Sequence, residues 1–119
     1  MLNVEERLLK VKLYKKYREE ALPNKNLIEK LKDKDFIIIT SRRAKWQEMT
    51  QSWVFKYNLK PSAILFYDQK EKTREKIIEY KARILNSLKV EIYYEDDKII
   101  LEGLKKLCPK TKILSPNNL

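Results

Sequence analysis

The chain contains no histidine, one cysteine and one glycine among its 119 residues. Without histidine, a zinc site of the usual Cys/His type and a Ser-His or Cys-His catalytic pair are effectively ruled out. The single cysteine, Cys108, cannot form an internal disulfide. We therefore expect a reducing, intracellular and cytoplasmic compartment. The classes of enzyme that depend on these residues are excluded.

No apolar run approaches the roughly 20 residues that a membrane-spanning helix needs. The N-terminus is basic, contains glutamate and has no hydrophobic signal-peptide core. These absences predict a soluble protein without a membrane partner. The length predicts a single α/β domain over 1–119, with an N-terminal segment at 1–26 and a tail at 115–119.

Positive charge is abundant, since 27 Lys and Arg against 17 Asp and Glu give a net charge of +10. Such a charge indicates nucleic acid or another phosphorylated ligand as a candidate partner. Phosphate-backbone contacts are first expected in the densest basic patch. This patch comprises Lys10, Lys12, Lys15, Lys16 and Arg18. A solvated helix face explains the same patch, and interspersed acids fit a thermophile-type surface of ion pairs.

The first twenty residues fit two structures. Asn3 and Glu6 form a capping-box pattern, which favours a helix over about 4–20. Apolar residues at positions 9, 11 and 13 alternate with lysines, which is the period of a strand. We favour the helix, because a strand in the middle of a parallel sheet should be apolar on both faces.

From residue 27 onward, helix-like and strand-like segments alternate along the chain. The strand-like segments are 36–40, 63–67, 90–94 and 111–114, and the helix-like segments are 26–34, 44–58, 71–88 and 98–107. This order predicts a three-layer, Rossmann-like α/β fold. We expect a mostly parallel sheet of about four to five strands with helices on both faces.

Two of the expected helices carry residues that bear on function. Trp46, Met49, Trp53 and Tyr57 form a stripe, and we predict that it packs in the core rather than stacking on bases. Lys81 falls on the apolar face of the 71–88 helix. Its ammonium either extends outward to solvent, which is the commoner outcome, or meets an anion.

Three adjacent acids, Glu95, Asp96 and Asp97, close the strand at 90–94 and directly precede a helix. Open α/β sheets bind ligands at the carboxyl ends of their strands, where carboxylates can hold Mg²⁺. Asp is also among the best residues to begin a helix, so a helix cap explains the run equally well. Another strand ends in the hydroxyls of Thr40 and Ser41, followed by two arginines.

Along the chain, a hydroxyl at the end of one strand is followed by a lysine on the apolar face of a helix and then by acids that close a later strand. This order resembles the haloacid-dehalogenase-like (HAD) phosphatase superfamily over about 27–114. Within it, they are most similar to uncapped phosphatases such as the 3′-phosphatase half of polynucleotide kinases. Ile37–Arg42 resembles the second motif of that family. Tyr80–Leu85 resembles the third motif and Tyr94–Asp97 the fourth.

The resemblance implies a role for each matching residue. Thr40, or Ser41 beside it, would hydrogen-bond a phosphoryl group, and Lys81 would neutralise its charge. The Mg²⁺ ligands that it implies are Asp96, Glu95 and Asp97. A metal, a lysine and a hydroxyl suit phosphoryl transfer, which depends on positioning and charge neutralisation.

The family's first motif, Asp-x-Asp-Gly after a central strand, has no match in the sequence. The most similar stretch, Asn3-Val4-Glu5, begins with an asparagine, which cannot act as a carboxylate nucleophile. Were Leu8–Tyr14 the central strand, lysines would follow it where acids belong. In the fold of that family, the first strand lies between the strands that correspond to 36–40 and 90–94. If it is missing, these two strands either pair directly with each other, or the N-terminal segment or another chain fills the gap between them.

Three functions remain open. The first is a degenerate HAD-like domain that retains a phosphate or Mg²⁺ site but has no phosphatase activity, unless a nucleophilic Asp is supplied elsewhere. The second is a basic nucleic-acid-binding protein on an α/β scaffold. The third is the incomplete half of a split phosphohydrolase, completed by a protein partner or another copy.

Overall fold

The computed structural model describes residues 24–118. Over this range, helices and parallel strands alternate, so the predicted α/β order is confirmed. The elements are α2 (Lys25–Leu31), β1 (Ile37–Arg43), α3 (Gln47–Lys56), β2 (Ala63–Tyr67), α4 (Arg74–Ser87), β3 (Ile92–Tyr94), α5 (Lys98–Leu107) and β4 (Lys112–Leu114). Short 3-10 turns, Ala44–Trp46 and Pro116–Asn118, precede α3 and follow β4.

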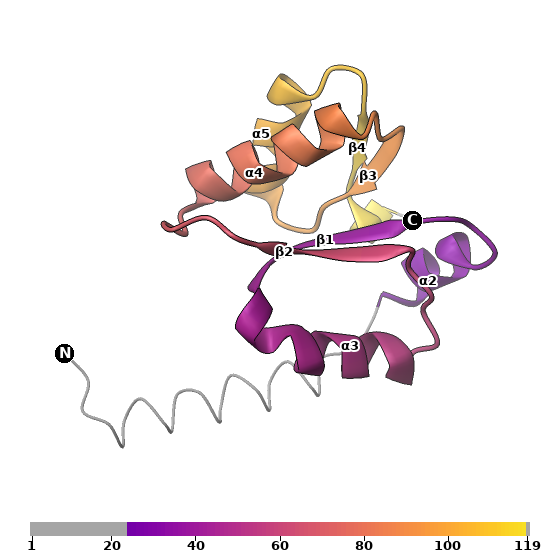
Figure 1. Cartoon of the computed structure of the whole chain (residues 1–119). Helices are drawn as coiled ribbons and strands as arrows, with labels where there is room; N and C mark the ends of the chain where they lie inside the picture. Colours follow the sequence, from indigo (N-terminus) through magenta and orange to yellow (C-terminus); the bar gives the residue numbers. More distant parts are fainter. Residues whose placement is uncertain (1–23, 119) are drawn as a thin grey trace, which may run out of the picture.

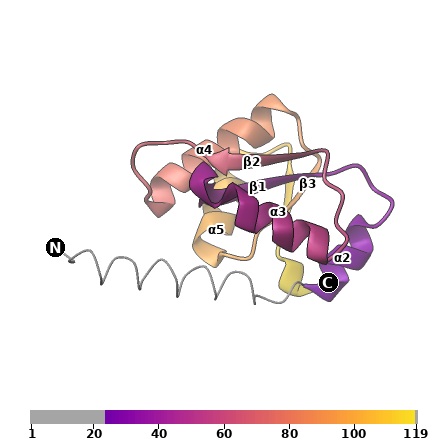
Figure 2. The ribbon, with the colours of Figure 1, turned by 60° about the horizontal axis from the view of Figure 1, so that its bottom comes forward.

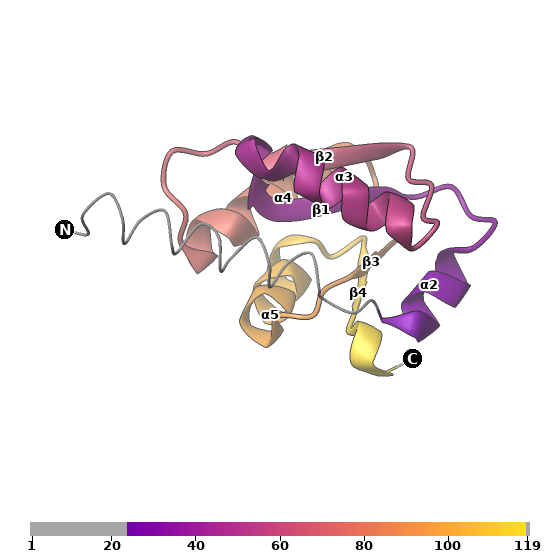
Figure 3. The same ribbon diagram turned by 90° about the horizontal axis from the view of Figure 1, so that it is seen from below.

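The four described strands form two separate parallel pairs, β1 with β2 and β3 with β4. In space they follow the order β2, β1, β3, β4, and β1 lies on the side of its pair that faces β3 (Figure 3). The described strands therefore form two small sheets where the sequence predicted a single sheet of four to five strands. Of the alternatives for the strands at 36–40 and 90–94, direct pairing with each other does not occur in the described residues.

Helices lie on both sides of the β1–β2 pair. Figure 1 shows α4 and α5 on one side and α3 on the other, and Figure 2 brings α3 forward in front of the strands. The helices α4 and α5 also contact each other directly.

Side-chain caps fix the starts of three helices. The side chain of Asn24 accepts the N–H of Leu27 at 2.9 Å and begins α2, rather than the predicted Asn26. Asn24 also donates to the carbonyl of Pro116 at 3.1 Å, which fastens the predicted tail to the start of α2. Thr73 begins α4 and Asp97 begins α5 in the same manner.

The main core lies where α4 and α5 meet the strands. Its buried residues are Ile39, Tyr67, Ile77, Tyr80, Ala82, Leu85, Ile100, Leu101, Leu104, Cys108 and Ile113. Gly103, the only glycine of the chain, allows the close approach of the two helices. A Cβ at this position would lie 2.6 Å from Cδ1 of Ile78.

The aromatic stripe of α3 is only partly core. Met49 is buried, but Trp46, Trp53 and Tyr57 are half-buried. The rings of Trp53 and Tyr57 pack on each other with centroids 5.0 Å apart.

Candidate phosphate and metal site

Lys81 and Glu95 form a buried ion pair. Lys81 follows Ile77 and precedes Leu85 at helical spacing, so it lies on the buried face of α4. Its Nζ donates to Oε1 of Glu95 at 2.6 Å, and the two side chains are 7% and 4% exposed. Of the two alternatives for Lys81, extension to solvent and contact with an anion, the structure shows contact with an anion. That anion is a carboxylate of the same chain.

Glu95 is held by two further donors. The hydroxyl of Tyr93 donates to Oε1 at 3.2 Å, and the N–H of Asp97 donates to Oε2 at 3.1 Å. Burial, and then the charge of Glu95, raise the pKa of Tyr93 well above its usual range. Both carboxylate oxygens are therefore engaged within the chain, and Glu95 serves to hold Lys81 in place.

Asp97 is the N-cap of α5. Its Oδ1 accepts the N–H groups of Ile99 at 3.0 Å and Ile100 at 3.1 Å. The backbone hydrogen bond from Ile100 contributes most to lowering the pKa of this carboxyl, and Arg74, 3.4 Å away, lowers it further. The helix-cap interpretation of the acidic run is thus confirmed for this residue.

Asp96 is exposed between these two engaged acids. Within the described part of the chain, it makes no hydrogen bond or ion pair. The three predicted Mg²⁺ ligands therefore have three different settings, and no cluster of three or more acidic, histidine or cysteine side chains in residues 24–118 could hold a metal ion. Mg²⁺ binding stays a prediction that centres on Asp96.

Thr40 and Ser41 lie where the pairing of β1 with β2 becomes irregular, between Ile39 and Arg43. The sequence predicted a strand that ends at Thr40, but β1 continues to Arg43. The hydroxyl of Thr40 accepts the N–H of Arg42 at 3.1 Å, which forms a local turn in the strand. Ser41 is half-buried beside it.

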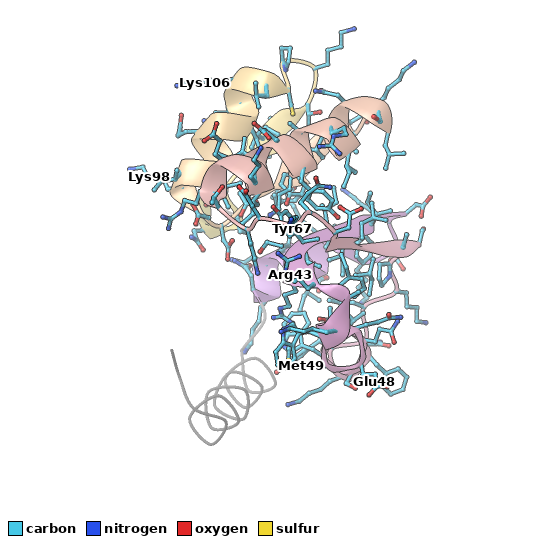
Figure 4. All side chains as sticks on the ribbon, turned by 60° about the vertical axis from the view of Figure 1, so that its left-hand side comes forward. Arg43, Glu48, Met49, Tyr67, Lys98 and Lys106 are labelled. Carbon is cyan, nitrogen blue, oxygen red and sulfur yellow. The ribbon has the colours of Figure 1, made fainter. Side chains whose placement is uncertain are left out.

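Arg43 fastens β1 to the loop after β2, a role that the sequence did not reveal. Its guanidinium donates to the carbonyls of Gln69 at 2.7 Å and Lys70 at 3.1 Å. The guanidinium also lies 5.3 Å from the ring centroid of Tyr67, and Figure 4 shows the two side chains together. The signal in the sequence was the pair of arginines after Ser41, which we interpreted only as part of a hydroxyl and guanidinium cluster at the end of a strand.

A groove of about 670 Å³ separates β1 from β3. Its walls include 36–39 on one side and 90–94 on the other. Helix residues also line it, namely Leu27, Lys30, Leu31, Leu85 and Leu88. Because β1 and β3 border the same groove, the irregular stretch after Ile39 and the acids after Tyr94 belong to neighbouring strands.

The predicted nucleic-acid patch from Lys10 to Arg18 lies outside the described residues. Within those residues, no helix has the length and apolar character to cross a membrane.

Comparisons of the chain with protein-family models, curated proteins and solved structures found no match.

Proposed function

We propose that the chain is a HAD-like phosphatase-fold domain that binds a phosphate group without hydrolysing it. In this proposal, Thr40, Ser41 and Lys81 donate to the phosphate, and Asp96 is the residue nearest to Mg²⁺. The proposal includes the three-layer arrangement, in which the two strand pairs belong to one interrupted sheet. Ligands of such sheets bind at the carboxyl ends of the strands.

The observation that carries the proposal is the placement of Lys81. An ammonium has three N–H donors, and Glu95 takes one of them. Glu95 and the ring of Tyr93, whose centroid is 5.7 Å from Nζ, hold the charge in one position. A cation held in advance loses less conformational freedom on binding an anion than a solvent-exposed lysine does.

The absence of turnover in this proposal follows from the missing first motif, which supplies the nucleophilic aspartate in the family that the chain resembles. Of the acids after β3, Glu95 is engaged by Lys81 and Asp97 caps α5. Asp96 is available, and its exposed position suits a metal that keeps several water ligands.

Calorimetric titration with inorganic phosphate in the presence of Mg²⁺ tests this function. Thr40→Val is expected to weaken binding about 10- to 100-fold, which corresponds to a hydrogen bond to a charged group of about 1.5–3 kcal/mol. Ser52→Ala, an exposed hydroxyl on α3, is the matched control and should bind as the parent does. Equal affinities for Thr40→Val and the parent would contradict the assignment.

An activity assay tests the second part of the proposal. We expect no Mg²⁺-dependent release of phosphate from a nitrophenyl ester. Release that persists through purification, and that is lost in Asp96→Asn, would show that the chain has a nucleophile and would overturn the inactive assignment.

A second candidate function, nucleic-acid binding, is favoured by the net charge of +10. Lys56 and the largely exposed Phe55 add a cation and an aromatic ring to the surface of α3. Affinity for single-stranded DNA that falls steeply between 50 and 200 mM salt would support it, because phosphate contacts release counterions. No binding at low salt would exclude it.

A further inference from the structure

The groove between β1 and β3 is bordered by two strands whose other edges are already paired. β1 pairs with β2 and β3 pairs with β4, and neither pair is joined to the other within residues 24–118. A strand has two hydrogen-bonding edges, so the inner edges of β1 and β3 present N–H and C=O groups for a further partner. Backbone groups at such edges attract an added strand.

The length of the groove suits a short strand. Residues 34–39 line one wall, of which 37–39 belong to β1, and residues 90–94 line the other, of which 92–94 belong to β3. At about 3.3 Å per residue, five residues of a strand span about 16 Å. An occupant of about five residues would thus extend along both walls, within the volume of about 670 Å³.

Most of the lining is apolar, which favours an occupant that is apolar on both faces, and the charged residues Lys30, Lys34, Asp35 and Glu91 line it as well. Leu88 reaches the groove from the end of α4, with Leu85 buried beneath it, and Leu27 and Leu31 reach it from α2. The strand walls add isoleucines at 37, 38 and 39. A strand between covered faces reads as a continuous apolar run rather than an alternating one.

The remaining part of this chain does not offer such a run. Its best strand-like stretch, Leu8–Tyr14, has lysines at positions 10 and 12, which would share one face of a strand. Enclosing two unpaired ammonium groups costs several kcal/mol for each ion. The net charge of +10 also favours an occupant that is flanked by acidic rather than basic residues.

We propose that the groove between β1 and β3 binds a β-strand of another polypeptide, about five residues long, apolar on both faces and flanked by acidic residues. The strand would join the two pairs into one sheet through main-chain hydrogen bonds. This inference rests on the groove alone and is independent of phosphate binding.

Hydrogen exchange of the full chain tests the proposal with two peptides. The probe has the sequence EEVIVIVEE, and the control, EEVSVSVEE, keeps its length and charge but makes one face polar. We expect the probe to slow exchange at least tenfold for those amides at 36–39 and 90–94 that do not already bond to β2, β4 or α4. The control peptide should leave these rates unchanged, and α3 amides should not respond to either peptide.

A pair of variants places the binding in the groove. Leu88→Lys puts a charge into the lining at a side chain that is 57% exposed, so the fold tolerates it. Phe55→Lys makes the same kind of change at an 85% exposed position that does not line the groove. The probe should bind Leu88→Lys at least tenfold more weakly than the parent and bind Phe55→Lys equally well.

Four results would overturn the proposal. Equal protection by both peptides would show that the groove does not select an apolar strand, and no protection at millimolar probe would show that it accepts none. Some amides at 36–39 and 90–94 do not bond to β2, β4 or α4, and strong protection of these before peptide is added would mean that the chain fills its own groove. Protection that rises with protein concentration would identify a second copy as the occupant.

Discussion

The two halves of the described chain repeat the same order of elements but bury their side chains unequally. Each half runs helix, strand, helix, strand and contains one parallel pair. Nine of the eleven residues of the main core come from the second half, and only Ile39 and Tyr67 come from the first. The second half thus forms the packed body of the molecule, against which the β1–β2 pair lies.

This difference indicates that the second half contributes most of the stability and that binding is expected at the boundary between the halves. In the second half, α4 and α5 lie side by side and enclose the pair of Lys81 and Glu95. In the first half, α3 leaves Phe55 85% exposed. The groove runs along the boundary between the halves, so a ligand there contacts both and would couple their stabilities.

The largest effect is expected from breaking the buried ion pair. Lys81→Met leaves Glu95 as an unpaired buried charge and should lower the free energy of unfolding by about 3–5 kcal/mol in urea titrations. Adding Glu95→Gln should recover part of this loss, because the lone charge is then removed. Lys105→Met, which breaks an exposed pair with Glu102, should cost less than about 0.5 kcal/mol. A loss below 1 kcal/mol for Lys81→Met would contradict the role of the pair.

The second largest effect is the difference in unfolding free energy lost when core side chains are truncated in the two halves. Leu104 is fully buried, and Leu104→Ala should cost about 3–5 kcal/mol. Met49→Ala, on the buried face of α3, should cost about 2 kcal/mol, since the site is shallower and can collapse further. Native-state hydrogen exchange should likewise show α3 opening more readily than α5. Equal opening of the two helices would remove the distinction between the halves.

The contact between α4 and α5 gives a third comparison. Gly103→Ala gains up to about 1 kcal/mol of helix propensity but forces a Cβ into Ile78, so we expect a net loss of about 1–2 kcal/mol. Ile78→Val removes Cδ1, the atom that lies 2.6 Å from the added Cβ, and should restore part of the loss in the double variant. Thermal unfolding of the four proteins measures this coupling, and additive effects would contradict it.

The smallest expected effect belongs to the cap of α5. Asp97→Ala should cost about 1 kcal/mol at neutral pH, whereas Asp97→Asn retains a capping oxygen and should cost less. The folded-state pKa of Asp97 is lowered, so its stabilisation is complete above the ordinary carboxyl pKa of about 3.9. It is lost as the pH falls from there through the lowered value. Acid unfolding of Asp97→Asn should lack this component, and an unchanged acid profile would contradict the assignment.

Local patterns in the sequence predicted most elements of the fold. The bounds of β2 and α5 agree with the predicted 63–67 and 98–107, because a continuous apolar run and a helix period with an Asp cap each identify one structure. The start of α2 was misplaced by two residues, since Asn24 and Asn26 are both good caps. Local chemistry alone does not decide between them.

The candidate site was less predictable than the elements. Helical spacing placed Lys81 on the core side of α4, but its partner could have been any anion near the strand ends. The adjacency of Glu95, Asp96 and Asp97 in the sequence suggested one metal site, yet their side chains go to a lysine, to solvent and to a helix end. Likewise, apolar runs identify strands but do not show which strand edges pair. The lack of pairing between β1 and β3 could therefore not be predicted from the sequence.

An NMR titration of the full chain with Mg²⁺ and inorganic phosphate tests the central claim most directly. We predict that the amides of Thr40 to Arg42 and of Glu95 to Asp97 shift together with one dissociation constant, while α3 does not respond. Asp96→Asn should abolish the Mg²⁺ dependence and leave the spectrum of the fold intact. If neither strand end responds to phosphate or Mg²⁺, the acids only hold Lys81 and cap α5, and the proposed phosphate site does not exist.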